Sequence, residues 1–316
     1  MADCFYAPDL PLVTIGIPVY NGGLYLRASL NCLLEQDYPR LEIIIADNAS
    51  TDETEAIATE FANTYPFIIY HRHPENIGAP ANFMCLTQKA RGKYFMWAST
   101  HDLWSPGLIS RAVEAMEADS NVVLSYAMPY WIIPSGKKIP LETTLHDTRS
   151  VSKLTGFTLV LWGLTACPQF YGVHRLDVIK RLKPFRKVFG PDNLFLAELA
   201  CKGSFALLTN EKFYMRQIAD FNDWYAYFRK LKMQLTRHSP RELYHEFILA
   251  HLKLVNEEFS RPTEKLALFF IVWYCMLSKY YWIPEIIQGA YEGQLRASGS
   301  ANNQTIVSQQ AKAETG

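Results

Sequence analysis

Cysteine patterns that would indicate a disulfide framework or a zinc site are missing from this sequence. The six cysteines are scattered over 316 residues, without a Cys-x-x-Cys pair or a cysteine–histidine cluster at zinc spacing. We interpret them as buried thiols in a reducing compartment. The N-terminus also lacks a positive stretch followed by an apolar one, so no signal peptide is expected and a cytoplasmic location is the default.

Several other classes of protein are disfavoured by what is absent. Lys plus Arg, 31, equals Asp plus Glu, 31, so no overall basic field favours a nucleic-acid partner. Neither a G-x-G-x-x-G motif nor a P-loop lysine motif occurs, which removes the usual dinucleotide and triphosphate cradles. The apolar run 266–277 has twelve residues, whereas a spanning helix needs roughly 20.

Alternating strand and helix patterns are present from residue 12 onward, and the 49% hydrophobic content is enough for a sizeable core. The expected strands are 13–19, 41–46, 67–70, 94–97 and 122–126. The expected helices are one from about Gly23 that Pro39 stops, one with a Ser50–Glu53 capping box, 79–90 and 108–118. This alternation predicts an α/β fold with a mainly parallel sheet, helices on both faces and right-handed crossovers.

Polar residues follow each of the first four strands, at the end where open α/β sheets bind ligands. They are Pro18, Tyr20 and Asn21; Asp47, Asn48, Ser50 and Asp52; Arg72, Asn76 and Gly78; and Ser99, Thr100, His101 and Asp102. Taken singly, each group has an ordinary explanation as a turn or a helix cap. Taken together, they favour a binding cleft at one sheet edge.

The stretch Tyr94–Pro106 is the centre of this hypothesis, because a short buried strand is followed at once by metal-competent side chains. The alternative is a capped turn, in which Asp102 or Ser105 caps a helix that starts near Pro106.

Four ordered motifs resemble family 2 glycosyltransferases over roughly residues 11–217. They are Val-Thr-Ile-Gly-Ile-Pro-Val-Tyr-Asn, Glu-Gln-Asp-Tyr-Pro-Arg-Leu-Glu-Ile-Ile-Ile-Ala-Asp-Asn-Ala-Ser-Thr-Asp-Glu-Thr, Glu-Asn-Ile-Gly and Ala-Arg-Gly-Lys-Tyr-Phe-Met-Trp. The resemblance implies a GT-A fold and transfer of a sugar from a nucleoside-diphosphate donor with inversion at the anomeric carbon. It also implies a nucleoside site, to which we assign Pro18, Tyr20, Asn21, Asp47, Asn48, Asn76 and Gly78. Asn48 stands where the family usually has a second acidic residue facing the nucleotide base, so the resemblance does not identify the donor nucleotide.

The family's acidic metal motif falls on Ser99-Thr100-His101-Asp102, with Pro106 in register and two carboxylates missing. The resemblance still implies a divalent cation, Mn²⁺ or Mg²⁺, with His101 and Asp102 as ligands, and imidazole favours manganese. The alternatives are a diphosphate held by amides and a cationic side chain alone, or a degenerate site.

Two later residues gain roles from the resemblance. Asp192 stands where family members carry the base that takes the acceptor hydroxyl proton, although by itself it would be interpreted as a helix N-terminal acid. Arg216 stands where relatives often have an arginine before a histidine, and we assign it a phosphate contact; Gln217 replaces the histidine.

The resulting domain prediction is a leader (1–10), a GT-A domain (11–220), a C-terminal helical region (221–292) and a disordered tail (293–316). The GT-A domain divides into a nucleotide-sugar half (11–126) and an acceptor half (127–220). Residues 262–292, with the apolar run and its aromatic flank, form either a helix packed on the domain or one lying at a membrane interface.

The expected function is glycosyl transfer to a hydroxyl of a glycan or lipid-linked acceptor in cell-surface polysaccharide or glycolipid synthesis. The alternative is a catalytically degenerate GT-A protein that binds nucleotide sugars or acts as a scaffold. A nucleotidylyltransferase is disfavoured, because the Gly-rich basic loop it needs after the first strand is missing.

Overall fold

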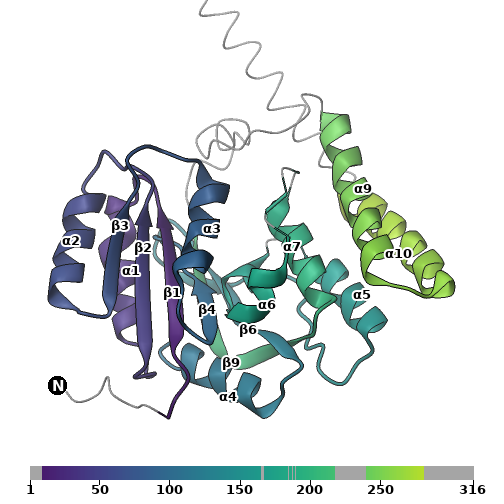
Figure 1. The fold of residues 1–316 in the computed structure, drawn as a ribbon, viewed down its shortest axis with the longest axis horizontal. Helices are drawn as coiled ribbons and strands as arrows, with labels where there is room; N and C mark the ends of the chain where they lie inside the picture. Colours follow the sequence, from purple (N-terminus) through teal and green to yellow (C-terminus); the bar gives the residue numbers. More distant parts are fainter. Residues whose placement is uncertain are drawn as a thin grey trace, which may run out of the picture.

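A mixed β-sheet of nine strands runs through the described part of the chain, with helices on both faces (Figure 1). The structure is a computed structural model that describes residues 9–164, 167–183, 185–186, 188, 190–217 and 240–280. The strand order is β3-β2-β1-β4-β8-β6-β9-β5, and β7 pairs with β6 off this path. The predicted α/β sheet with helices on both faces is therefore confirmed, and it also contains antiparallel pairs.

The first half of the sheet is parallel. It consists of β1 (Val13–Val19), β2 (Leu41–Asp47), β3 (Ile68–Arg72) and β4 (Tyr94–Trp97). The register sets Val19 opposite Asp47 and Asp47 opposite Arg72. The carboxyl ends of these strands therefore meet at one edge, as the sequence predicts, and the loops that follow them are neighbours.

The second half of the sheet is mixed. It contains β5 (Leu103–Trp104), β6 (Val122–Ile132), β7 (Lys138–Pro140), β8 (Val173–Arg175) and β9 (Ser204–Arg216). Because β8 is antiparallel to both β4 and β6, β6 runs in the same direction as β4, and β9 runs parallel to β6. The long strands β6 and β9 thus end at the same edge as β1 to β4.

Two hydrophobic cores lie on the two faces of the sheet. One is formed with α1 (Gly23–Leu34), α2 (Thr54–Thr64) and α4 (Leu108–Ala118). The other is formed with α3 (Ala79–Lys89), α5 (Lys153–Gly163), the 3₁₀ turn η2 (Pro168–Tyr171), α6 (Leu176–Arg181) and α7 (Pro191–Ala200). Along β4, Tyr94 and Met96 belong to the first core while Phe95 and Trp97 belong to the second. This alternation explains why the whole strand is apolar.

Two local predictions are wrong. The Ser50–Glu53 capping box does not form, because α2 begins at Thr54 without a side-chain cap and the Ser50 hydroxyl accepts a hydrogen bond from the Asn21 N–H instead. Pro39 does not stop the first helix, since α1 already ends at Leu34.

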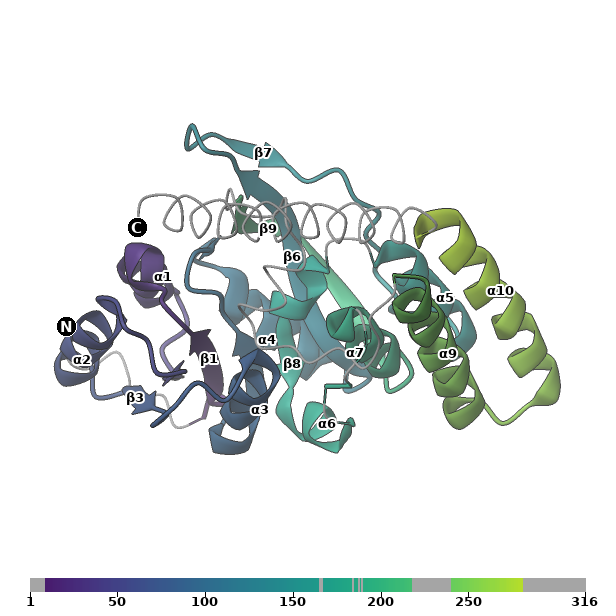
Figure 2. The same ribbon diagram turned by 90° about the horizontal axis from the view of Figure 1, so that it is seen from above.

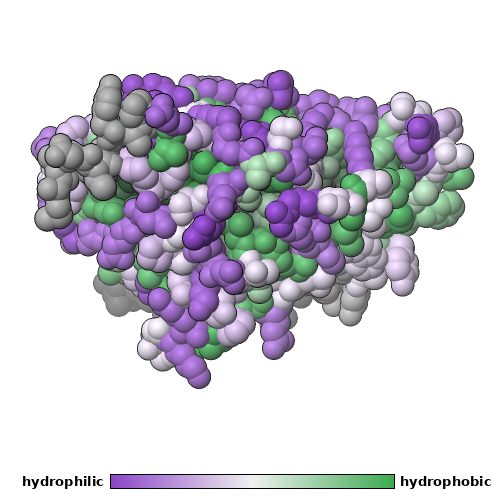
Figure 3. Space-filling model, turned by 90° about the horizontal axis from the view of Figure 1, so that it is seen from below, coloured by the Kyte–Doolittle hydropathy of each residue, from purple (hydrophilic) through white to green (hydrophobic). Residues whose placement is uncertain are grey.

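The C-terminal helices α9 (Pro240–Glu258) and α10 (Pro262–Tyr280) pack against each other, and α10 also contacts α5. Leu268, Val272 and Met276 on α10 are buried. A second apolar set on the same helix is exposed: Leu266, Phe270, Trp273, Tyr274 and Leu277. Apolar side chains are accordingly visible at the surface at the right-hand end of Figure 3, where α10 lies. In the described part of the chain, no helix combines the length and apolar character that crossing a bilayer requires.

Residues 1–8, 218–239 and 281–316 lie outside the described residues. The predicted leader, tail and much of the predicted C-terminal region fall there, and the domain division stays a prediction.

Candidate functional site

The loops after β1 and β2 are hydrogen-bonded to each other, which fixes one side of the carboxyl edge. Asn21 adopts a left-handed backbone (φ 52°), a conformation that asparagine tolerates better than most residues. Its N–H donates to Ser50 Oγ at 2.9 Å, and its Oδ1 accepts from the N–H of Thr51 at 2.8 Å. Asn21 therefore supports the loop geometry through contacts the sequence did not reveal.

Asp47, at the end of β2, is fully buried and its carboxylate is saturated by protein donors. Oδ1 accepts from the N–H of Ser50 at 2.8 Å. Oδ2 accepts from the Tyr70 hydroxyl and from Arg72 Nη1, both at 2.8 Å. Buried carboxylates need such partners. Of these partners, Arg72 has a side chain that is 33% exposed. Tyr20, one residue beyond the Val19 that lies opposite Asp47, is 37% exposed.

Asn48, Asn76 and Gly78 form one hydrogen-bonded unit between the second and third loops. Asn48 Nδ2 donates to Asn76 Oδ1 at 3.1 Å, and Asn76 Oδ1 also accepts from the N–H of Gly78 at 2.9 Å. Asn48 Oδ1 accepts from the N–H of Ile77 at 2.8 Å. Gly78 has φ 85°, which favours glycine there. An amide at position 48 serves this unit as donor and acceptor at once, which a carboxylate could not do.

The turn after β4 carries His101 and Asp102. His101 Nδ1 lies 2.9 Å from Ser99 Oγ, and His101 Nε2 lies 3.8 Å from Asp102 Oδ1. The alternative of a helix cap is wrong: Gly107 precedes α4 without a side-chain cap, and Ser105 Oγ donates to Glu211. The backbone carbonyls of Ser99 and Asp102 both accept from the buried Ser29 hydroxyl, so the turn is hydrogen-bonded to helix α1.

Arg216, at the end of β9, is hydrogen-bonded to this turn. Its N–H donates to Asp102 Oδ1 at 2.8 Å and its Nε donates to the carbonyl of His101 at 3.1 Å. The guanidinium lies over the Tyr25 ring, 4.6 Å from its centroid. A permanent positive charge is thereby fixed beside His101 and Asp102.

Burial decides the protonation of this turn. Burial lowers the pKa of His101 to about 4, and the nearby Arg216 charge acts in the same direction. Burial also raises the pKa of Asp102 to about 7, while the Arg216 N–H, the Ser99 hydroxyl and the Arg216 charge oppose the shift. At neutral pH the imidazole is therefore uncharged, which is the form that binds metals.

Asp192 lies in the first turn of α7, and Gly190 precedes that helix without a side-chain cap. Burial raises the pKa of Asp192, and hydrogen bonds from the Asn193 N–H and the Cys167 thiol oppose the shift. The next turn of α7 carries Phe195, whose ring centroid is 5.5 Å from that of Trp97. Trp97 is the last residue of β4, so α7 packs beside the strand end from which the His101–Asp102 turn begins.

Sequence reasoning missed the supporting residues Tyr70, Tyr25, Ser29 and Cys167. Tyr70 lies within the third predicted strand, and its position two residues before Arg72 was a usable signal for a shared face. Nothing in the sequence pairs Cys167 with Asp192, because the two residues are 25 positions apart and β8 and α6 lie between them.

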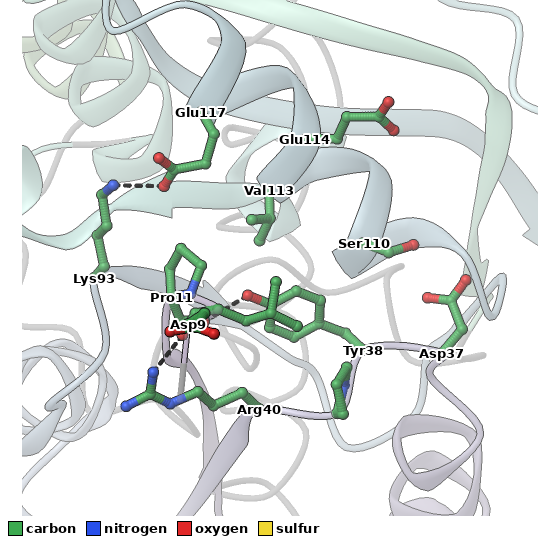
Figure 4. Close-up of a pocket in the computed structure, with 12 residues that line it drawn as sticks. Asp9, Pro11, Asp37, Tyr38, Arg40, Lys93, Ser110, Val113, Glu114 and Glu117 are labelled. Carbon is green, nitrogen blue, oxygen red and sulfur yellow. Dashed lines mark hydrogen bonds and ion pairs between the residues drawn. The ribbon is translucent and has the colours of Figure 1, made fainter. Parts of the chain in front are cut away.

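A cavity of about 710 Å³ lies at the opposite edge of the sheet. Its lining includes Pro11 and Lys93, which precede β1 and β4, and residues of α4 (Figure 4). The Tyr38 hydroxyl donates to the Pro11 carbonyl at 2.6 Å, and Lys93 pairs with Glu117. None of the predicted site residues lines it, so this cavity is separate from the candidate site.

The sequence profile described as Glycosyl transferase family 2 matches residues 14–178, which is just over half of the chain. The chain belongs to glycosyl transferase family 2.

Among curated proteins, an uncharacterized glycosyltransferase of Rickettsia prowazekii is 36% identical over 117 residues, covering 37% of this chain and 36% of the relative. The abequosyltransferase RfbV of Salmonella typhimurium is 42% identical over 86 residues, covering 26% of each chain. A putative teichuronic acid biosynthesis glycosyltransferase of Bacillus subtilis, TuaG, is 25% identical over 142 residues, covering 45% of this chain and 55% of the relative. The chain thus spans about a third of the R. prowazekii relative and a quarter of RfbV.

Solved structures share the fold. S. aureus TarS 1–349 in complex with UDP-GlcNAc has a TM-score of 0.65 at 17% identity, covering 85% of this chain and 73% of that one. A mannosyltransferase from Pyrobaculum calidifontis in complex with GDP-Man and Mn²⁺ has a TM-score of 0.58 at 16% identity, covering 95% and 81%. At these identities the likeness establishes the fold alone, and it confirms the predicted GT-A fold.

Proposed function

We propose that this family 2 member is an inverting hexosyltransferase that moves a sugar from a nucleoside-diphosphate donor to a hydroxyl of a glycan or lipid-linked acceptor. The product would belong to a cell-surface polysaccharide or glycolipid. Family membership supports glycosyl transfer, and the names of RfbV and TuaG support a surface polysaccharide. The observation that carries the proposal is the common sheet edge at which the Asp47–Asn48 loops and the His101–Asp102 turn lie. The packing of Phe195, three residues after Asp192, on Trp97 at the end of β4 supports placing Asp192 beside them.

In this proposal the donor nucleoside lies over the first three loops. Pro18, Tyr20 and Asn21 border it from β1, and Asp47 with its partners borders it from β2. Asn48, Asn76 and Gly78 hold the next loop in place beside it. The nucleotides in the TarS and P. calidifontis complexes support a nucleotide-sugar partner in general terms.

Asp192 is proposed as the general base. Its ionised carboxylate takes the proton from the acceptor hydroxyl while that oxygen attacks the anomeric carbon and the bond from that carbon to the diphosphate breaks. The nucleoside diphosphate leaves with the electron pair of that bond. The guanidinium of Arg216, fixed beside the β4 turn, offsets charge on the departing diphosphate.

His101 and Asp102 fit a divalent cation in part. His101 Nδ1 is engaged by Ser99 Oγ while Nε2 faces Asp102, an orientation in which a metal-binding imidazole has its other nitrogen fixed. No group of three His, Cys, Asp or Glu side chains suited to a metal occurs among the described residues, so diphosphate and water oxygens would supply the other ligands. A bound Mn²⁺ or Mg²⁺ would neutralise charge on the leaving diphosphate.

A degenerate GT-A protein that binds nucleotide sugars or acts as a scaffold is the second candidate. Ser99 and Thr100, in place of acidic residues, favour it. Both candidates are compatible with a peripheral position on the inner face of the cytoplasmic membrane, for which the exposed apolar side chains of α10 provide a contact surface.

Calorimetry with UDP, GDP, CDP and dTDP, with and without Mn²⁺, tests the proposal. Binding of one nucleotide, followed by hydrolysis or transfer of the corresponding donor sugar, is expected of the enzyme. Binding without any turnover across a donor panel supports the second candidate, and no nucleotide binding at all contradicts both.

A further inference from the structure

The ends of β6, β7 and β9 form an arm that projects beyond the rest of the sheet (Figure 2). In this arm Tyr130 pairs with Tyr214, and Ile132 pairs with both Lys138 and Arg216. Side chains alternate along a strand, so Tyr130, Tyr214, Lys212, Lys138 and Arg216 share one face. We call these five residues the basic aromatic face.

The two lysines and the two tyrosines of this face contact one another. The Lys138 ammonium lies 4.0 Å from the centroid of the Tyr214 ring, and the Lys212 ammonium lies 5.4 Å from that of Tyr130. The two tyrosine centroids are 5.7 Å apart. Both lysines are exposed and both tyrosines are half-buried. The tyrosine rings thus hold two ammonium groups at the surface without neutralising them.

In the described part of the chain, the two lysines of this face are not paired with a carboxylate. The nearest acid along β9 is Glu211, which by strand alternation belongs to the opposite face of the sheet. Its carboxylate accepts a hydrogen bond from Ser105 Oγ at 2.5 Å. Within the described ranges, neither Lys138 nor Lys212 takes part in an ion pair with a carboxylate. Other lysines of this protein, such as Lys93 and Lys202, are ion-paired.

The position of the face relates it to the candidate site. Tyr214 is opposite Leu103 in the β5–β9 pair, and Leu103 directly follows Asp102. The Arg216 N–H binds Asp102 itself. A chain lying along the face therefore arrives at the His101–Asp102 turn, while the loops assigned to the donor nucleoside lie on the β1 to β3 side of that turn.

We infer that the basic aromatic face binds an anionic acceptor, a sugar chain that carries carboxylate or phosphate groups. Its tyrosine rings pack against the apolar faces of sugar rings, and its lysines pair with the acidic substituents. This inference rests on the proposed function, because it names the class of acceptor for the same transfer reaction.

The test measures binding of hexagalacturonate, which carries a carboxylate on each sugar, against maltohexaose, which is uncharged and of the same length. The wild-type protein is expected to prefer hexagalacturonate, with an affinity that falls as salt is added. Lys138→Gln and Lys212→Gln are each expected to weaken that binding by about 2- to 5-fold, and the double variant by about 10-fold.

Lys137→Gln is the matched control, because it removes the same charge from an exposed neighbour that lies outside the face. It is expected to bind hexagalacturonate like the wild type. Equal loss in Lys137→Gln, or equal affinity for the two oligosaccharides, overturns the inference.

Two further measurements separate the other possible ligands. If the lysine variants lose affinity for a nucleoside diphosphate, the face belongs to the donor; if they lose binding only to phosphatidylglycerol vesicles, it is a membrane contact. Either result overturns the inference while the proposed function stands. Loss of the proposed function appears instead as wild-type protein that neither binds nor turns over any donor.

Discussion

The carboxylate of Asp102 and the backbone N–H of Arg216 are joined by a 2.8 Å hydrogen bond between residues 114 positions apart. This bond connects the turn after β4 to the end of β9. A backbone donor serves this contact, so side-chain substitution at position 216 leaves it in place. The guanidinium and the bond to Asp102 can therefore be tested separately.

Asp192→Asn is expected to lower transfer by roughly 10²- to 10⁴-fold while the donor still binds, because a general base contributes about that factor. Turnover and donor affinity are measured on the same preparation. Glu198→Gln on the same helix is a poor control because Glu198 is buried and pairs with Arg186. Asp177→Asn on α6 is used instead, because Asp177 is exposed and its ion pair with Arg181 lies at the surface, where such pairs contribute little. Unchanged turnover in Asp192→Asn removes this residue from the role.

The pH dependence of transfer is expected to reflect the raised pKa of Asp192. The base acts when ionised, so activity rises with pH, and its acid limb lies above the ordinary aspartate value of about 3.9. Cys167→Ala removes a donor to the ionised carboxylate, so the limb is expected to move to higher pH. Cys167→Ser keeps a hydroxyl donor and should restore the wild-type profile, whereas coincident profiles for all three proteins contradict the thiol's influence.

His101→Ala is expected to abolish any enhancement of donor binding by Mn²⁺, because it removes the imidazole ligand. Calorimetry with and without the metal gives the comparison. His245→Ala, an exposed histidine on α9, is the control for loss of an imidazole elsewhere. Retention of the full metal effect in His101→Ala places the cation at other ligands.

Acid is expected to destabilise the fold through its buried histidines. Burial lowers the pKa of His251 to about 4. A depressed histidine contributes stability that is present above about pH 6.5 and is lost as the pH falls toward about 4; the full shift corresponds to roughly 3 kcal/mol. Denaturant unfolding at pH 7 and pH 4.5 is expected to show a smaller loss for His251→Gln than for the wild type or His245→Gln. If all three proteins lose the same stability between pH 7 and pH 4.5, groups other than His251 cause the destabilisation by acid.

Phe270→Ser on α10 is expected to weaken sedimentation with phosphatidylglycerol vesicles without lowering the melting temperature, because Phe270 is 70% exposed. Val272→Ser is the opposite case: its side chain is buried, and the change should cost roughly 1.5–3 kcal/mol of stability. If the wild-type protein does not sediment with the vesicles, α10 has a packing role alone.

The strands and helices that the sequence predicts well are those whose apolar pattern records burial. The bounds of 13–19, 94–97 and 108–118 agree with β1, β4 and α4 to the residue, because these elements are covered on the faces that their apolar residues mark. The capping box was wrong since a tertiary partner, the Asn21 N–H, takes the Ser50 hydroxyl. A local motif cannot register that competition.

The candidate site was predictable only as far as its strands were. Parallel strands place their following loops together, so the juxtaposition of Asn21, Asp47 and Asn48 follows from topology. The partners of those side chains, such as Tyr70 on Asp47 or Arg216 on Asp102, depend on register across the sheet. The roles of these residues in transfer remain predictions.

The sheet order also has a consequence for how the protein is made. β5 follows β4 by five residues in the chain, yet its partner in the sheet is β9, which ends at Arg216. During synthesis the ribosome has to release about a hundred further residues before Leu103 and Trp104 can pair with β9. By contrast, β1 to β4 pair among themselves and need no later strand for that. The nucleotide side of the protein can therefore take shape early, whereas the turn that carries His101 acquires its final support only when β9 has emerged.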